Sequence, residues 1–377
     1  MNGEQDNGAG LDSRALIRIA VAAGYQLSPR LLETLRTQGL LPRPQRTAQH
    51  GRTPVWTYPP GAERQLLSLL AWREQTKDPD VLRVLLWLDG FPIALALVRE
   101  ALATGVQQVL TLFQQAIAEA ASSQQRDAKE DGGGANDEAV SRIAAVLAAK
   151  RGARSLPRHS RVSATERARS VELLLRTFAL GQRVDATPHD ADTIERVLGV
   201  GRRGRRDTVD GSGPWLVGPP ETLFDTVEVL SLPAALQAVR AATDAELETA
   251  RGVAMAVLRY LPLMARMMAA TFDDDNYAGF AGVQPLDQHP EIAMIMVPVI
   301  LSMLQAGWHD QLHDITAALA RVPELSAQTE LLLQLPAKTI QANLANQPHD
   351  QQQAVQRIID AAIDGKLNPP GRGLDRP

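Results

Sequence analysis

Prolines decide which parts of the first 75 residues can be helical. Five prolines fall within residues 42–60: Pro42, Pro44, Pro54, Pro59 and Pro60. Because proline removes a backbone N–H and clashes with the preceding helical turn, this stretch cannot be a helix. Apolar residues at helical spacing lie on both sides of it. The chain must therefore pass from helix to a non-helical segment and back again.

Two helices are expected before the proline-rich stretch. The first spans SRALIRIAVAAG, with Ser13 as its N-cap and Gly24 as its C-cap. The second begins at Ser28-Pro29, an N-cap followed by proline at the first helical position, and ends at Gly39. Helical spacing returns from Gly61.

A short strand is expected within the proline-rich stretch. Residues 55–58, Val-Trp-Thr-Tyr, have the β-branched and aromatic content typical of strands. The order of helix, short turn, helix, proline-bearing hairpin and helix in residues 13–75 matches a winged helix-turn-helix. In that arrangement the second helix offers side chains to the major groove of DNA and the hairpin reaches the flanking backbone.

Charge is distributed unevenly along the chain. The whole chain has a formal net charge of −4. Residues 11–75 contain nine arginines and four acidic residues, which gives a local net charge of +5. A local excess of arginine is what the neutralisation of DNA phosphates requires.

The N-terminal third of the sequence resembles the MerR family of transcription regulators. SPRLLETLRTQGLLPRPQR is similar to the family's recognition-helix segment, with matches at Ser28, Pro29, Leu32, Gly39, Leu40, Leu41 and Pro42. Tyr58, followed by a helix near Gly61, resembles the post-wing tyrosine and third helix. WLDGFPIALALVREAL resembles the segment that leads into the family's dimerisation helix. The resemblance covers about residues 13–120 and implies a homodimer that reads an inverted-repeat operator.

The chain departs from the family pattern at several positions. Glu33, Thr34 and Leu35 stand where the family has an arginine and two aromatics. Trp56 replaces the arginine that usually lies two residues before the wing tyrosine, and residues 71–80 resemble an insertion. These changes concern the usual DNA contacts rather than the fold.

The candidate DNA-binding residues follow from the helix, the wing and the resemblance. They are Ser28, Arg30, Arg36, Arg43, Arg46, His50, Arg52 and Tyr58. The alternative for any one arginine is a solvated surface position. For Trp56 and Tyr58, packing within the wing is favoured over contact with bases.

A long apolar stripe follows, on a helix expected from Phe91 to Ser122. Its members are spaced three or four residues apart, as on a coiled-coil seam: Leu95, Val98, Leu102, Val106, Val109, Phe113 and Ile117. The stripe is interpreted as a homodimer helix or as a core helix within one chain. Periodicity does not separate these two readings, and the resemblance favours the dimer.

The whole chain is expected to be mainly α-helical. The predicted order is a disordered tail (1–12), the winged helix-turn-helix domain (13–90), the dimerisation helix (91–122) and a linker (123–137). A helical segment (138–199), a Gly/Arg/Pro loop (200–221), a helical effector or partner domain (222–365) and a tail (366–377) follow. Residues 199–204 fit a Gly-x-Gly-x-x-Gly pattern, but the pattern follows a helical segment instead of a strand, which argues against a dinucleotide site.

Composition limits the chemistry. The chain has no cysteine, which excludes disulfides, thiolate zinc sites and cysteine nucleophiles. His309 and His313 are four residues apart but lack the glutamate of a His-Glu-x-x-His zinc motif, so no metal and no cofactor are predicted. Seven methionines between Met255 and Met303 are expected in a helical core, with an effector pocket as the alternative.

The sequence thus predicts a DNA-binding transcription regulator of MerR type. It is expected to be cytoplasmic, homodimeric and without membrane contact. A small organic effector or a protein partner is expected to bind the C-terminal region. The alternative is a non-enzymatic adaptor protein with a degenerate winged-helix domain, and an enzyme is a distant third because no nucleophile–base constellation stands out.

Overall fold

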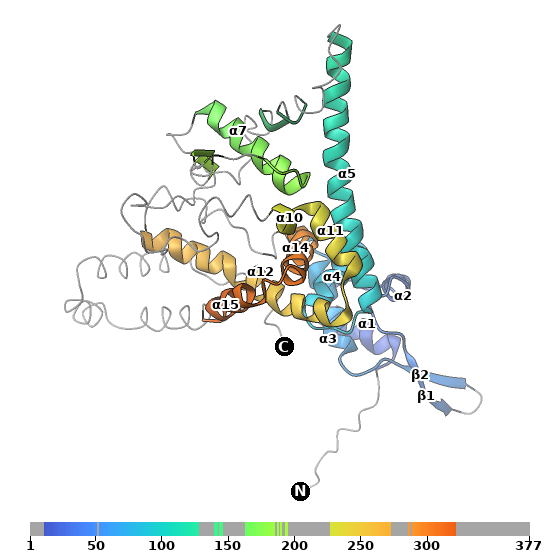
Figure 1. Cartoon of the computed structure of the whole chain (residues 1–377). Coiled ribbons are helices and arrows are strands. Elements are labelled where there is room, and N and C mark those ends of the chain that lie inside the picture. Colours follow the sequence, from blue (N-terminus) through green and yellow to red (C-terminus); the bar gives the residue numbers. More distant parts are fainter. Residues whose placement is uncertain are drawn as a thin grey trace, which may run out of the picture. The chain divides into compact units, whose positions relative to one another are not determined.

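A computed structural model describes residues 11–50, 53–127, 163–184, 227–272 and 289–321, together with short pieces near 140, 190 and 286. This part of the chain is mainly helical and contains one two-stranded sheet (Figure 1). It divides into two compact units. The N-terminal unit contains residues up to Leu102 and residues 289–294, and the second unit contains the described residues from Ala103 to Leu286 and from Ile295 onward.

Two short helices begin the N-terminal unit. Helix α1 spans Ser13–Ala22 and helix α2 spans Pro29–Thr37. The N-cap of α1 is Asp12 and not Ser13 as predicted, because the Asp12 carboxylate accepts the N–H of Ala15 at 2.7 Å. The predicted cap of α2 is confirmed, since Ser28 Oγ accepts the N–H of Leu31 at 3.1 Å.

The proline-rich stretch forms an antiparallel hairpin, as predicted. Strand β1 (Gln45–His50) pairs with β2 (Thr53–Thr57), and Arg46 lies opposite Trp56. A bulge interrupts the ladder between Arg46 and Ala48. Residue Leu11, expected in the disordered tail, forms a single β-bridge in which its carbonyl accepts the N–H of Tyr58 at 2.7 Å.

Helices α3 (Ala62–Trp72) and α4 (Pro79–Leu88) build the core of the N-terminal unit. The largest fully buried side chain is Trp87, and leucines from both helices surround the core at zero exposure: Leu66, Leu69, Leu82, Leu85 and Leu86. The indole N–H of Trp72 and the hydroxyl of Ser68 both donate to Asp89 Oδ2, at 2.8 and 2.6 Å. These polar contacts satisfy groups that the packing of α3 and α4 removes from water.

Helix α5 spans Leu95–Asp127, five residues beyond the predicted end at Ser122. Its last turns are rich in Gln, Ser and Ala, which a helix tolerates without large apolar groups, so the predicted linker begins later. Val98, Leu102 and Val106 of the apolar stripe are completely buried within the single chain. This burial favours the core-helix reading for these three positions.

Two elements of the second unit pack on the later part of α5. The elements of this unit include α7 (Ala164–Leu174), a π-helical turn η1 (Leu175–Ala179), α10 (Val227–Leu230) and α11 (Leu232–Ala241). One apolar cluster joins α5, η1 and α11 through Val106, Leu110, Ala179, Leu232 and Leu236. Val109 and Phe113 of the stripe pack against this cluster while remaining partly exposed.

The remaining described helices are α12 (Asp244–Phe272), η3 (Pro290–Ile292), α14 (Ala293–Gln305) and α15 (His309–Ala320). Met294 is buried and Met255, Met296 and Met303 are half-buried, as expected for helical packing. Among the described residues, no helix is long and apolar enough to cross a membrane. The predictions for residues 1–10, most of 128–162, 200–221 and 322–377 lie outside the described residues.

Candidate nucleic-acid interface

Helix α2 has one buried and one solvent-facing side. Leu32 and Leu35 are buried, with 3% and 0% of their surface exposed. After Pro29, which is exposed at the first position, the exposed residues of α2 lie on one side of the helix: Arg30, Glu33, Thr34 and Thr37. This face begins at the helix N-terminus, where unpaired backbone N–H groups and the helix dipole favour a negatively charged neighbour.

The two arginines of α2 differ in their surroundings. Arg30 is exposed, and no acidic side chain among the described residues pairs with its guanidinium. Arg36 is paired with Glu33, with 2.5 Å between Nη2 and Oε1, and its side chain is 32% exposed. Arg30 can therefore bind an anion without first breaking an ion pair. The charge of Arg36 is instead balanced by Glu33, one helical turn away.

The hairpin places its basic residues at the surface next to an unexpected aromatic. Arg43 and Arg46 are exposed. Trp56 is 53% exposed, so about half of the side chain predicted to pack within the wing is open to solvent. The backbone of His50 lies in β1, but its side chain is outside the described part, as is all of Arg52.

Tyr58 lies in the core instead of at the surface. Its side chain is only 4% exposed, and its backbone N–H is bonded to Leu11. The structure therefore gives it the packing role that was favoured for it. Of the predicted set, the surface of the N-terminal unit presents Ser28, Arg30, Arg36, Arg43 and Arg46.

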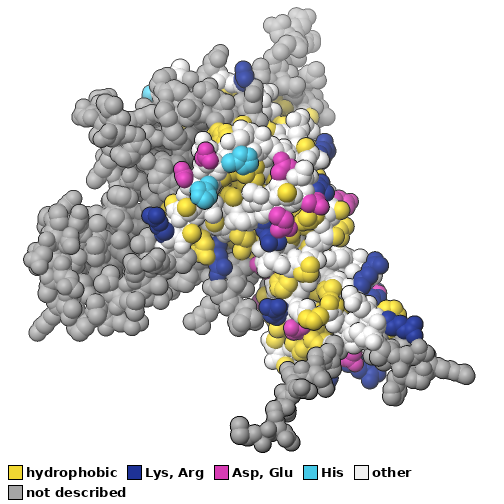
Figure 2. Space-filling model, turned by 60° about the horizontal axis from the view of Figure 1, so that its bottom comes forward, with side chains coloured by type: hydrophobic (Ala, Val, Ile, Leu, Met, Phe, Trp, Pro, Cys, Tyr) yellow, Lys and Arg dark blue, Asp and Glu magenta, His cyan; other side chains and the backbone are white. Residues whose placement is uncertain are grey.

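Two further arginines extend the basic surface. Arg14 and Arg18 are exposed on α1, one helical turn apart. In the sequence they contribute to the local net charge, and their spacing of four residues already places them on one face of a helix. Figure 2 shows Lys and Arg side chains in dark blue gathering toward the lower right of the view.

Buried polar contacts fix the end of α2. Gln65 Nε2 donates to the carbonyl of Leu40 at 2.9 Å, and Gln65 is only 2% exposed. Arg83 Nε donates to the carbonyl of Gln38 at 3.0 Å and its guanidinium also pairs with Asp80. Because these carbonyls follow directly after α2, α3 and α4 hold this helix in a defined orientation.

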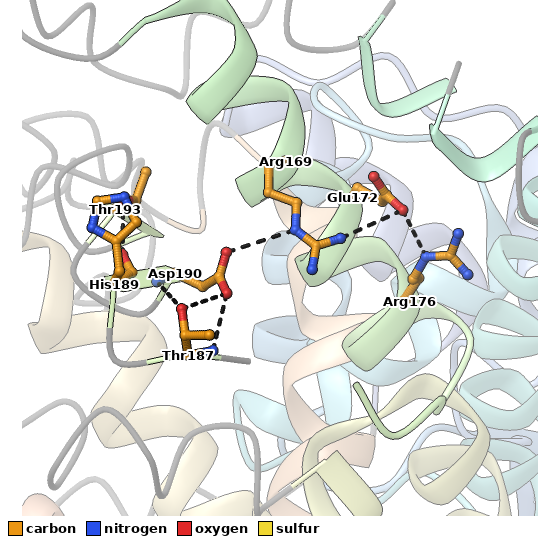
Figure 3. Close-up of polar contacts among 7 residues, drawn as sticks. All are labelled: Arg169, Glu172, Arg176, Thr187, His189, Asp190 and Thr193. Atoms are coloured by element: carbon orange, nitrogen blue, oxygen red, sulfur yellow. Dashed lines mark hydrogen bonds and ion pairs between the residues drawn. The ribbon is translucent and has the colours of Figure 1, made fainter. Parts of the chain in front are cut away.

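A chain of ion pairs in the second unit has a structural explanation. Arg169 lies between Asp190 and Glu172, at 3.6 and 3.8 Å, and Glu172 also pairs with Arg176 at 2.9 Å (Figure 3). Thr187 and Asp190 bond reciprocally, as in a capping box.

Burial raises the pKa of the Asp190 carboxyl, but the hydrogen bonds from Thr187 and the nearby Arg169 guanidinium together bring it below the usual value. The capping box and the ion pairs thus stabilise the local helix start.

The histidine pair of α15 is exposed, with His309 and His313 one turn apart. In the part of the chain that the structure describes, no group of three or more His, Cys, Asp or Glu side chains is arranged to hold a metal ion. Near this pair, hydrogen bonds from Thr243 lower the pKa of the Glu246 carboxyl at the start of α12.

Comparison of the chain with known proteins identifies no relative. The chain matches no model of a known protein family, and no curated protein or solved structure is significantly similar to it. The function must therefore be inferred from the residues and geometry of the N-terminal unit.

Proposed function

We propose that the N-terminal unit is a winged helix-turn-helix domain that binds double-stranded DNA. In this proposal α2 is the recognition helix, α1 crosses the DNA backbone and the β1–β2 hairpin is the wing. The observation that supports it most is the solvent face of α2, which starts at a capped N-terminus with exposed Arg30 and adjoins an arginine-bearing hairpin. The local excess of arginine in an otherwise acidic chain supports the same partner.

In the proposed complex, the exposed residues of α2 make different kinds of contact in the major groove. Arg30, near the helix N-terminus, is long enough to reach a guanine edge or a phosphate. Thr34 and Thr37 offer methyl groups for contact with thymine, while their hydroxyls donate to carbonyls of the preceding turn. Arg14, Arg18, Arg43 and Arg46 would neutralise phosphates on both sides.

The wider proposal is a transcription regulator of the MerR type acting as a homodimer. The second unit would then bind an effector or a protein partner. Because Val98, Leu102 and Val106 are buried in their own chain, the second copy would have to contact later turns of α5. Leu112 is 64% exposed there, and Ile117 is half-buried.

An alternative follows from Glu33. This carboxylate lies on the solvent face of α2 with its side chain 54% exposed, and it neutralises Arg36. A negative charge on that face opposes contact with phosphates. The alternative function is therefore an adaptor protein that keeps the winged fold without binding an operator.

Binding measurements on point variants separate the two functions. Arg30→Ala in the full chain should weaken binding to duplex DNA about tenfold or more and reduce the dependence on salt. Arg321→Ala removes an exposed arginine of the second unit with the same change in net charge and should have little effect. Equal affinity of the two variants would contradict the proposed recognition helix.

A further inference from the structure

Trp56 occupies an unusual position for a large aromatic side chain. It is 53% exposed, whereas its neighbour Thr57 is 8% exposed. Successive side chains of a strand point to opposite faces, so Trp56 lies on the face of the hairpin turned away from the core. Exposed tryptophan is a common feature of binding surfaces because its ring gains much from losing contact with water.

A cation lies on the same face. Arg46 is the cross-strand partner of Trp56 in the antiparallel ladder, and directly opposite residues share a face of the sheet. Arg46 is also exposed. The outer face of the hairpin therefore carries an arginine and a tryptophan that are ten residues apart in sequence but directly opposite in the sheet.

The charge of this segment indicates what the pair binds. Residues 42–60 contain three arginines, one histidine and no Asp or Glu. An apolar protein surface would not require this charge, but a polyanion would. Aromatic and apolar side chains pack against sugars and base edges in the minor groove, while arginine contacts the adjacent phosphates.

We propose that Trp56 and Arg46 form a contact with the sugar–phosphate backbone at the edge of the minor groove, beside the groove that α2 enters. This inference rests on the proposed DNA-binding function and assigns DNA contact to Trp56, for which the sequence favoured packing within the wing. Trp56 supplies a salt-independent part of the affinity, and Arg46 supplies a salt-dependent part.

Fluorescence anisotropy of a labelled mixed-sequence duplex, titrated with the full chain at about 50 and 200 mM salt, tests the assignment. Trp56→Ala should weaken binding about tenfold at both salt concentrations, and Trp56→Phe should recover much of the loss. Arg46→Ala should weaken binding and lower the slope of log affinity against log salt by about one. Circular dichroism of each variant checks that the exposed positions leave the fold unchanged.

The outcomes distinguish this inference from the function on which it rests. If Arg30→Ala weakens binding and Trp56→Ala does not, the domain binds DNA but the wing contact is refuted. If the unaltered chain binds no duplex, both fail. If Trp56→Ala changes the oligomeric mass and leaves DNA affinity unchanged, the exposed ring belongs to a protein interface and the proposed DNA contact is overturned.

Discussion

Replacing Gly39 by alanine should destabilise the N-terminal unit through two separate effects. Gly39 follows α2 with a φ of +73°, in the left-handed region that alanine rarely adopts. A Cβ at this position would also lie 2.8 Å from Cδ1 of Leu97 on α5. Glycine is therefore required both by the backbone and by the close approach of α5.

The two effects can be separated with a matched control. Gly24 has a φ of +91°, but a Cβ there would meet nothing within 4 Å, so Gly24→Ala carries only the backbone cost. We expect about 1 kcal/mol for Gly24→Ala, after allowing for the reduced freedom of the unfolded chain. Displacing Leu97 from its rotamer should add about 1 kcal/mol, so that Gly39→Ala costs about 2 kcal/mol.

Urea denaturation of the full chain, followed by tryptophan fluorescence and circular dichroism, measures these free energies of unfolding. In a Leu97→Ala background the extra cost of Gly39→Ala should disappear, because the methyl group then has room. Equal costs for Gly39→Ala and Gly24→Ala in the unaltered background would refute the close contact. An extra cost that persists without the Leu97 side chain would do the same.

Three further predictions concern capping, burial and protonation. Ser28→Ala should lower the free energy of unfolding by about 1 kcal/mol and Ser28→Asp should retain most of it, as urea midpoints will show. Leu102→Ala should cost about 2–5 kcal/mol independently of protein concentration, whereas a concentration-dependent loss would indicate a dimer interface at this residue. Hydrogen bonds from Thr243 lower the pKa of Glu246, so its stabilising effect is present above the ordinary glutamate pKa and is lost as the pH falls through the lowered value. Glu246→Gln should flatten that acidic limb of the stability curve, and an unchanged limb would exclude this contribution.

Local sequence signals predicted the elements of the N-terminal unit well. Ser28-Pro29 marked the start of α2 because a side-chain acceptor and a fixed φ act within a few residues. The prolines between residues 42 and 60 excluded a helix for equally local reasons. The error at the start of α1 is one residue, because Asp12 and Ser13 are both good caps and spacing alone does not choose between them.

Features that depend on distant parts of the chain were harder to predict. The exposure of Trp56 depends on which face of the hairpin is covered, and a short strand does not show this in its sequence. Its pairing with Arg46 depends on a register that includes a bulge. The apolar stripe predicted a buried face on α5, but periodicity could not show that α11 and η1 of the same chain cover its middle part.

The central claim is that the N-terminal unit binds double-stranded DNA through α2 and the hairpin. The most direct test is selection from a random duplex library with the purified full chain, followed by titration of the recovered sequence at two salt concentrations. The account predicts an enriched motif, bound far better than a scrambled duplex and more weakly as salt increases. Weak binding without any enriched motif would contradict it and favour the adaptor function.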